Sequence, residues 1–120
     1  MRTLTLALAV AMATVGLMAS PAAAGSACGQ DGVAILCVTA QQTQDVLALN
    51  YQVTQKDGPG IYSAYYVDAT GGSPSNSQAV GPLGYQSLAL GALYGQLNHC
   101  YNVHLDSAPG TSLVVGPVCQ

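Results

Sequence analysis

Apolar side chains recur at every second position in several short runs of this chain. Leu47, Leu49, Tyr51 and Val53 form one such run, and the Tyr-x-Val-x-Leu segment at Tyr101–Leu105 forms another. Successive side chains of a β-strand point to opposite faces of its sheet, so a period of two predicts strands with one buried face. Beyond residue 24, no stretch of about ten residues carries the apolar period of a helix. The chain is therefore expected to be all-β.

Turn residues divide these runs into about seven predicted strands. Glycine and proline end a strand because they supply turn geometry or remove a hydrogen-bond donor from the ladder. The predicted strands span residues 33–39, 46–54, 62–69, 79–84, 88–93, 101–106 and 112–118. The proline-containing stretch at 79–84 is expected to form at most a short edge strand. Short strands at this spacing predict an all-β sandwich or barrel, of which a single antiparallel β-sandwich is the form we expect.

The first 24 residues have the features of a secretory signal peptide. Arg2 supplies a positive charge, an apolar run follows from Leu4 to Met18, and Ala22–Ala24 offers a cleavage site. The apolar run is shorter than the ~20 residues that a membrane span requires. Lipoprotein processing at Cys28 is the alternative, and it would leave an odd number of thiols. We therefore expect a secreted, extracellular domain at residues 25–120, without a stable membrane anchor.

Four cysteines in a short exported chain predict two disulfide bonds. Cys28 and Cys37 flank the turn signal Gln-Asp-Gly at 30–32, while Cys100 and Cys119 flank the Ala-Pro-Gly signal at 108–110. A hairpin at each signal would place its two cysteines opposite each other, which favours the pairs Cys28–Cys37 and Cys100–Cys119. Zinc ligation by the four thiols is the alternative, but the sequence has no CxxC motif.

Charged residues are few, and this limits the classes of partner and of chemistry. The formal net charge is −3, and Lys56 is the only basic residue after Arg2, so nucleic acid is not an expected partner. The chain has no Glu, and its five Asp residues occur singly, without the spacing of an acid–base pair. Calcium binding at the turn aspartates would need clustered acids. No metal, no cofactor and no catalytic activity are therefore expected.

The order of the runs resembles a fibronectin type III domain across most of residues 25–120. The apolar–aromatic second strand of that family is matched by Leu47, Leu49 and Tyr51. Its Pro/Gly loop is matched by Asp57–Gly60, and its Tyr-x-Val third strand by Tyr65–Val67. Its Leu before a corner that leads into a Tyr-x-Val strand is matched by Leu93 and Tyr101–Leu105. Tyr51 stands where the family usually has Trp, the corner is somewhat longer, and the family seldom carries disulfides. An immunoglobulin-like fold is the alternative.

That resemblance implies the positions of several tyrosines. Tyr101 would pack inward and bond its hydroxyl to nearby backbone. The third strand would lie beside residues 101–106, and with Tyr65 inward, Tyr62 and Tyr66 would face outward near Asn102 and His104. Tyrosine brings contact area at low entropic cost, so this surface is the predicted binding site. The expected function is a non-catalytic module that binds another extracellular protein, as an adapter or a subunit of an assembly.

Other roles remain open at the level of sequence. An inhibitor of a secreted enzyme could present the loop Thr70–Gln78 or Lys56–Gly60, and a small carbohydrate-binding module could stack polysaccharide on Tyr62 and Tyr66. Tyrosine is also simply common on exposed strands. His104 and Asp106 share a strand face and could form a base–orienter pair, but no Gly-x-Ser-x-Gly nucleophile motif accompanies them.

Overall fold

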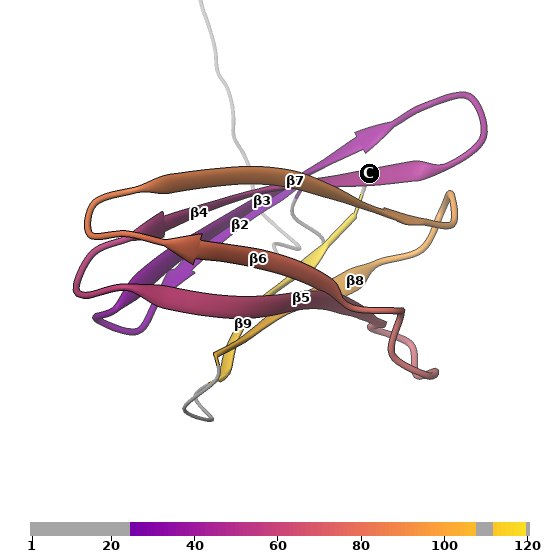
Figure 1. The fold of residues 1–120 in the computed structure, drawn as a ribbon. Coiled ribbons are helices and arrows are strands. Elements are labelled where there is room, and N and C mark those ends of the chain that lie inside the picture. The colour runs from indigo at the N-terminus through magenta and orange to yellow at the C-terminus, as the bar shows by residue number, and fades with distance from the viewer. Residues whose placement is uncertain (1–24, 108–111, 120) are drawn as a thin grey trace, which may run out of the picture.

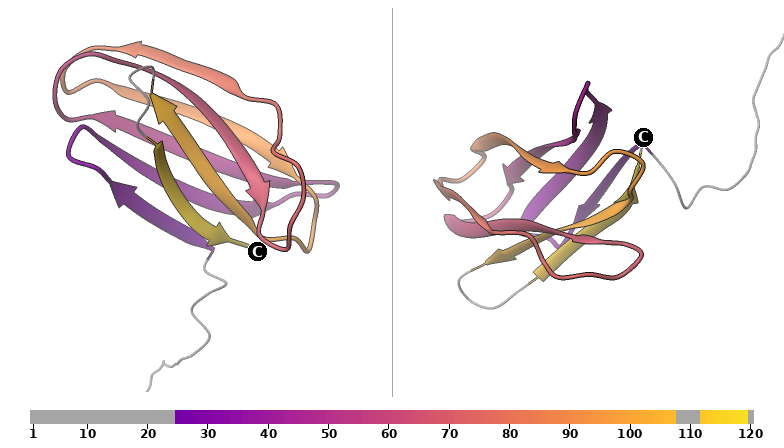
Figure 2. Two further views of the ribbon diagram at one scale, coloured as in Figure 1. Left: turned by 90° about the horizontal axis from the view of Figure 1, so that it is seen from below. Right: turned by 90° about the vertical axis from the view of Figure 1, so that its right-hand side faces the viewer.

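A computed structural model describes residues 25–107 and 112–119, which form eight β-strands and contain no helix. The strands are β2 (Ser26–Gln30), β3 (Ala34–Gln42), β4 (Leu47–Gln55), β5 (Gly60–Asp68), β6 (Gln78–Leu83), β7 (Leu88–Gly95), β8 (Tyr101–Ser107) and β9 (Ser112–Val118). They form two four-stranded antiparallel sheets, in the orders β2-β3-β4-β7 and β6-β5-β8-β9. Figures 1 and 2 show the sheets as two layers.

This arrangement confirms the predicted all-β antiparallel sandwich. The eighth strand is β2, which the sequence prediction had treated only as one side of the turn between Cys28 and Cys37. The predicted signal peptide at residues 1–24 and the predicted turn at 108–110 lie outside the described residues. Within the described residues, no helix is long and apolar enough to cross a membrane.

One hydrophobic core lies between the two sheets and draws side chains from both. On β4 the alternating residues predicted to share a buried face do so, and Leu47, Leu49 and Val53 are fully buried. Each such aliphatic side chain stabilises the fold by roughly 1.5–3 kcal/mol when it leaves water. The principal core residues from the remaining strands are Leu36, Val38, Tyr62, Ala64, Val80, Leu93, Tyr101, Val103, Leu105, Val115 and Val118.

Both predicted disulfide bonds are present. Cys28 lies directly opposite Cys37 in the β2–β3 ladder, and the Asp31 carboxylate shapes the connecting turn by accepting from the amides of Val33 and Ala34 at 2.9 and 3.0 Å. The second bond joins Cys100 to Cys119 at the open end of the β8–β9 pair. Closing loops of these lengths stabilises the folded chain by about 3 kcal/mol each.

Tyr101 occupies the predicted corner position. Its side chain is buried, and its hydroxyl oxygen accepts a hydrogen bond from the backbone amide of Gln96 at 2.7 Å. The ring lies against Gly95 so closely that a Cβ there would come within 2.4 Å of it. Gly95 is therefore required by contact with the Tyr101 ring rather than by an unusual backbone conformation.

Three of the four edge strands, β6, β7 and β9, carry features that limit further pairing. Pro82 in β6 and Pro117 in β9 each follow a glycine through a cis peptide bond, and neither has an N–H to donate. The short edge strand predicted around residues 79–84 is thereby confirmed. On the edge strand β7, the carbonyl of Ala92 accepts from Gln78 Nε2, and that of Tyr94 accepts from the Tyr66 hydroxyl, both at 2.9 Å. Side chains of the opposite sheet thus occupy part of the β7 edge.

Candidate functional site

The tyrosines of β5 point opposite to the predicted directions. Tyr62 is only 5 % exposed, and Tyr66 packs on the core, where its ring meets Tyr101 edge-on with centroids 4.6 Å apart. Tyr65 lies on the other face of the strand. The prediction that Tyr62 and Tyr66 face outward as a binding or stacking platform is therefore wrong.

The physical reason lies in the hydroxyl groups of the inward tyrosines. The Tyr62 hydroxyl donates to Oε1 of the fully buried Gln55, and the Tyr66 hydroxyl donates to the Tyr94 carbonyl. With these acceptors available, the sandwich buries the rings while satisfying their polar ends. Ala64 lies between these two tyrosines in sequence and is fully buried. Its small side chain lets both rings fit on the same strand face.

Asn102 and His104 lie on the partly exposed positions of β8, as predicted. The register places Tyr65 opposite His104 and Ser63 opposite Asp106. The Tyr65 and His104 rings stack with centroids 4.8 Å apart and an interplanar angle of 12°. His104 therefore holds the outward tyrosine in a defined orientation, since stacking restricts its rotation.

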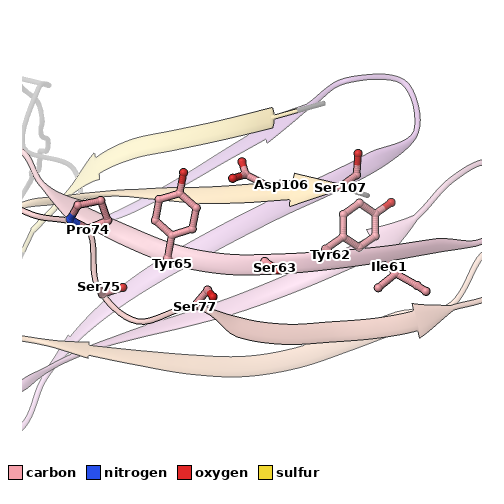
Figure 3. A pocket seen from close by; sticks show the side chains of 9 residues that line it. All are labelled: Ile61, Tyr62, Ser63, Tyr65, Pro74, Ser75, Ser77, Asp106 and Ser107. Atoms are coloured by element: carbon pink, nitrogen blue, oxygen red, sulfur yellow. The ribbon is translucent and has the colours of Figure 1, made fainter. Parts of the chain in front are cut away.

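A groove runs beside this tyrosine on the outer face of the sheet (Figure 3). Its volume is about 470 Å³, within the range of protein ligand sites. We name it the Tyr65 groove, and its lining residues come from β5, the end of β8 and the segment before β6: Ile61, Tyr62, Ser63, Tyr65, Pro74, Ser75, Ser77, Asp106 and Ser107. The lining thus combines an aromatic ring, apolar carbon, hydroxyl groups and one carboxylate.

Asp106 is the charged group of the groove. Its Oδ1 accepts from the Ser112 hydroxyl at 2.7 Å. Partial burial raises the pKa of Tyr65, and hydrogen bonding to the Asp106 carboxylate and the negative charge of that group raise it further. His104 and Asp106 do share a strand face as predicted, and Tyr65 interacts with both of them.

The wall formed by residues 74–77 is attached to β5 through two hydrogen bonds between Ser75 and Tyr66. The Ser75 amide donates to the Tyr66 carbonyl, and the Tyr66 amide donates to Ser75 Oγ, each at 2.9 Å. Ser75 therefore continues the pairing of β5 beyond the start of β6. Because this wall is held by these two hydrogen bonds, the groove is formed before any ligand arrives.

A second group of polar side chains lies at the corner before β8, and sequence reasoning did not find it. His99 Nδ1 lies 2.6 Å from Asp68 Oδ2, and the Thr70 hydroxyl and amide donate to Asp68 Oδ1 at 2.7 and 2.9 Å. The Thr70 hydroxyl, His99 and the Thr70 amide lower the pKa of Asp68 from its ordinary 3.8 to about 2. Asp68 and His99 are 31 positions apart, so no local pattern in the sequence could reveal the pair.

No group of three or more His, Cys, Asp or Glu side chains that could hold a metal ion occurs in residues 25–107 and 112–119. No protein-family model matches the chain, and no curated protein or solved structure shows significant similarity to it.

Proposed function

We propose that this chain is a secreted, non-catalytic interaction module that binds another extracellular protein through the outer face of β5 and β8. The observation that carries the proposal is the fixed Tyr65–His104 stack beside a preformed groove. A rigid tyrosine loses little conformational freedom on binding, and it offers both a ring and a hydroxyl to a partner.

The compartment in this proposal follows from the disulfides. Bonds such as Cys28–Cys37 and Cys100–Cys119 persist in oxidising surroundings and are rare in the cytosol. Together with the signal-like composition of residues 1–24, they support export. The module then acts outside the cell as an adapter or as a subunit of a larger assembly.

We further propose that the sandwich is a variant of the fibronectin type III fold. In support, β5 lies beside β8, and the Tyr101 hydroxyl bonds to backbone at the corner, as that resemblance implies. The added strand β2 and the two disulfides distinguish this chain from the usual pattern.

Affinity capture tests the interaction with a matched pair of variants. The purified protein is immobilised and exposed to culture supernatant of the organism that makes it, and bound proteins are identified by mass spectrometry. We expect recovery of one exported protein in near-stoichiometric amount by the native chain and by Leu90→Ser, an exposed position on the opposite sheet. Tyr65→Ser should reduce the recovery at least tenfold. Equal recovery by all three proteins would contradict the proposed face.

A second candidate is an inhibitor of a secreted enzyme that presents the segment before β6. The observation that favours it is the fixation of exposed residues around Pro74 by the paired hydrogen bonds between Ser75 and Tyr66. Replacing Ser73 and Asn76 with alanine separates the two functions, because these exposed residues of the segment do not line the Tyr65 groove. An inhibitor would lose potency against its enzyme, whereas a module that binds through Tyr65 and His104 would still capture its partner.

A further inference from the structure

Asp106 brings a negative charge to the Tyr65 groove that no basic side chain of the described chain balances. The Ser112 hydroxyl donates to its Oδ1 at 2.7 Å, and the Tyr65 hydroxyl interacts with its carboxylate, so the groups beside it are hydroxyls. Lys56 is the one Lys or Arg among residues 25–107 and 112–119, and its ammonium group donates to Gln30 Oε1 at 2.8 Å. The groove therefore offers a carboxylate whose counter-charge can come from a bound molecule.

The aromatic ring beside this carboxylate is suited to a planar cation. His104 covers one face of Tyr65 at a centroid distance of 4.8 Å, and Tyr65 also lines the groove. A cation placed against a tyrosine ring is attracted by the negative face of the ring, and more strongly where water is excluded. A guanidinium group can stack on the ring and donate to a carboxylate at the same time, because its donors lie in the plane of the group.

The rest of the lining suits the chain that would carry such a cation. Pro74 and Ile61 provide apolar carbon, and the hydroxyls of Ser63 and Ser77 can bond to peptide groups. The volume of about 470 Å³ holds more than one side chain. A short extended peptide segment with one buried arginine matches this combination better than a neutral sugar, which would leave the carboxylate without a counter-charge.

We infer that the Tyr65 groove receives an arginine side chain of the partner protein, stacked on Tyr65 and paired with Asp106. This inference rests on the proposed function, since it names the chemistry by which the same face recognises its partner. His104 contributes by holding the Tyr65 ring through the stack between the two rings.

The test is a titration of the ¹⁵N-labelled, disulfide-bonded protein with N-acetyl-Gly-Arg-Gly-amide, followed by amide chemical shifts. The matched probe replaces arginine with citrulline, which has a similar shape and no charge. We expect the arginine peptide to shift the amide signals of Ser63, Tyr65 and Asp106, and to bind at least tenfold more tightly than the citrulline peptide. High salt should weaken the arginine peptide only.

Two variants and one control locate the contact. Asp106→Asn should weaken binding of the arginine peptide about tenfold, and Tyr65→Leu should weaken it several-fold. Asp45→Asn removes a charge from an exposed turn at the far end of the β3–β4 hairpin (Figure 1) and should leave binding unchanged. Equal affinity for the two peptides, unchanged binding by Asp106→Asn, or stronger shifts of the same signals with the neutral sugar maltose would each overturn the inference.

The outcome is separable from that of the capture experiment. If capture of the exported partner depends on Tyr65 but the arginine peptide does not bind, the arginine inference fails while the interaction module stands. If the arginine peptide binds at the groove but no exported protein is recovered, the groove chemistry stands and the proposed protein partner fails.

Discussion

The two faces of β5 use the same residue type for opposite purposes. On the inner face, the Tyr62 hydroxyl donates to Gln55 in the interior of the sandwich, and the hydroxyl of the partly buried Tyr66 donates to the Tyr94 carbonyl at the exposed edge of β7. On the outer face, Tyr65 stacks on His104 and lines an open groove. The inner rings connect the two sheets, whereas the outer ring remains available to a partner.

All seven aromatic residues of the chain are tyrosine, and this contrast accounts for five of them. A phenylalanine would fill nearly the same volume in the core, but it has no hydroxyl group to form a hydrogen bond with the opposite sheet. Tyr51 and Tyr101 follow the inner pattern, because the first donates to Gln78 Oε1 at 2.7 Å and the second accepts from Gln96. The hydrogen-bond partner of the hydroxyl therefore distinguishes a tyrosine that stabilises the fold from one whose ring lies on the outer surface.

The largest expected difference between the faces is in stability after truncation. Tyr62→Ala should lower the free energy of unfolding by about 3–5 kcal/mol, because it leaves a cavity and removes the partner of buried Gln55. Tyr65→Ala should lower it by about 1 kcal/mol or less, since a partly exposed ring loses its stack on His104 and its interaction with Asp106. Urea denaturation of the disulfide-bonded proteins measures both values, and similar losses would contradict the assignment of the two faces.

A smaller effect is expected where a glycine accommodates an inner ring. Gly95→Ala would place its Cβ 2.4 Å from the Tyr101 ring, so the ring or the strand must shift at a cost of about 1–3 kcal/mol. Gly84→Ala is the control, because its Cβ would meet only Ser87 Oγ at 3.4 Å. Thermal unfolding of the two variants compares them, and an unchanged melting temperature for Gly95→Ala would show that Tyr101 does not fill this space.

Removing single hydroxyl groups sharpens the comparison further. Tyr101→Phe should cost about 1–2 kcal/mol, because the Gln96 amide loses its acceptor. Tyr65→Phe should cost no more than about 0.5 kcal/mol, as is usual for a partly exposed position. Chemical denaturation at neutral pH gives both numbers. If Tyr65→Phe proved the more costly of the two, the hydroxyl on the outer face would have a structural role.

The smallest expected effect is a loss of stability in acid, and it arises at the corner beside Tyr101, where Asp68 pairs with His99. The centroids of the His99 and Tyr101 rings lie 6.2 Å apart. The pKa of Asp68 is lowered from 3.8 to about 2, so its carboxylate stabilises the fold fully above pH 4. This contribution is lost as the pH falls from about 4 towards 2. Asp68→Asn should flatten that part of the stability profile, whereas Asp106→Asn should leave a clear acid-induced decrease. Identical profiles for the native chain and Asp68→Asn would exclude the contribution.

The sequence was sufficient for seven of the eight described strands, the disulfide pairs and the corner tyrosine because each has a local signal, whereas β2 was missed. Alternation identifies β4 and β8, and turn signals between the cysteines identify their partners. It was insufficient for the orientation of β5, because Tyr-Ser-Ala-Tyr-Tyr-Val is compatible with either phase of a period of two. Distant acceptors such as Gln55 and the Tyr94 carbonyl favour one phase, and the fold alone brings them near.

The candidate site was predictable only in part for the same reason. Asn102 and His104 were placed on the correct face, since their strand carries a clear apolar alternation. Tyr65 was assigned to the interior, and its stack with His104 depends on the register between β5 and β8. The segment around Pro74 is fixed by Ser75, whose contacts with Tyr66 have no signal in the local sequence.

The treatment of the sheet edges bears on association between copies of this protein. With a formal net charge of only −3, electrostatic repulsion between copies is weak, and exposed strand edges would invite fibril growth. Pro82 and Pro117 interrupt the edges of one sheet, while Gln78 and Tyr66 occupy carbonyls along β7 of the other. Stability against self-association at high concentration thus depends on steric blocking of the ladder, and should persist in salt concentrations that screen charge.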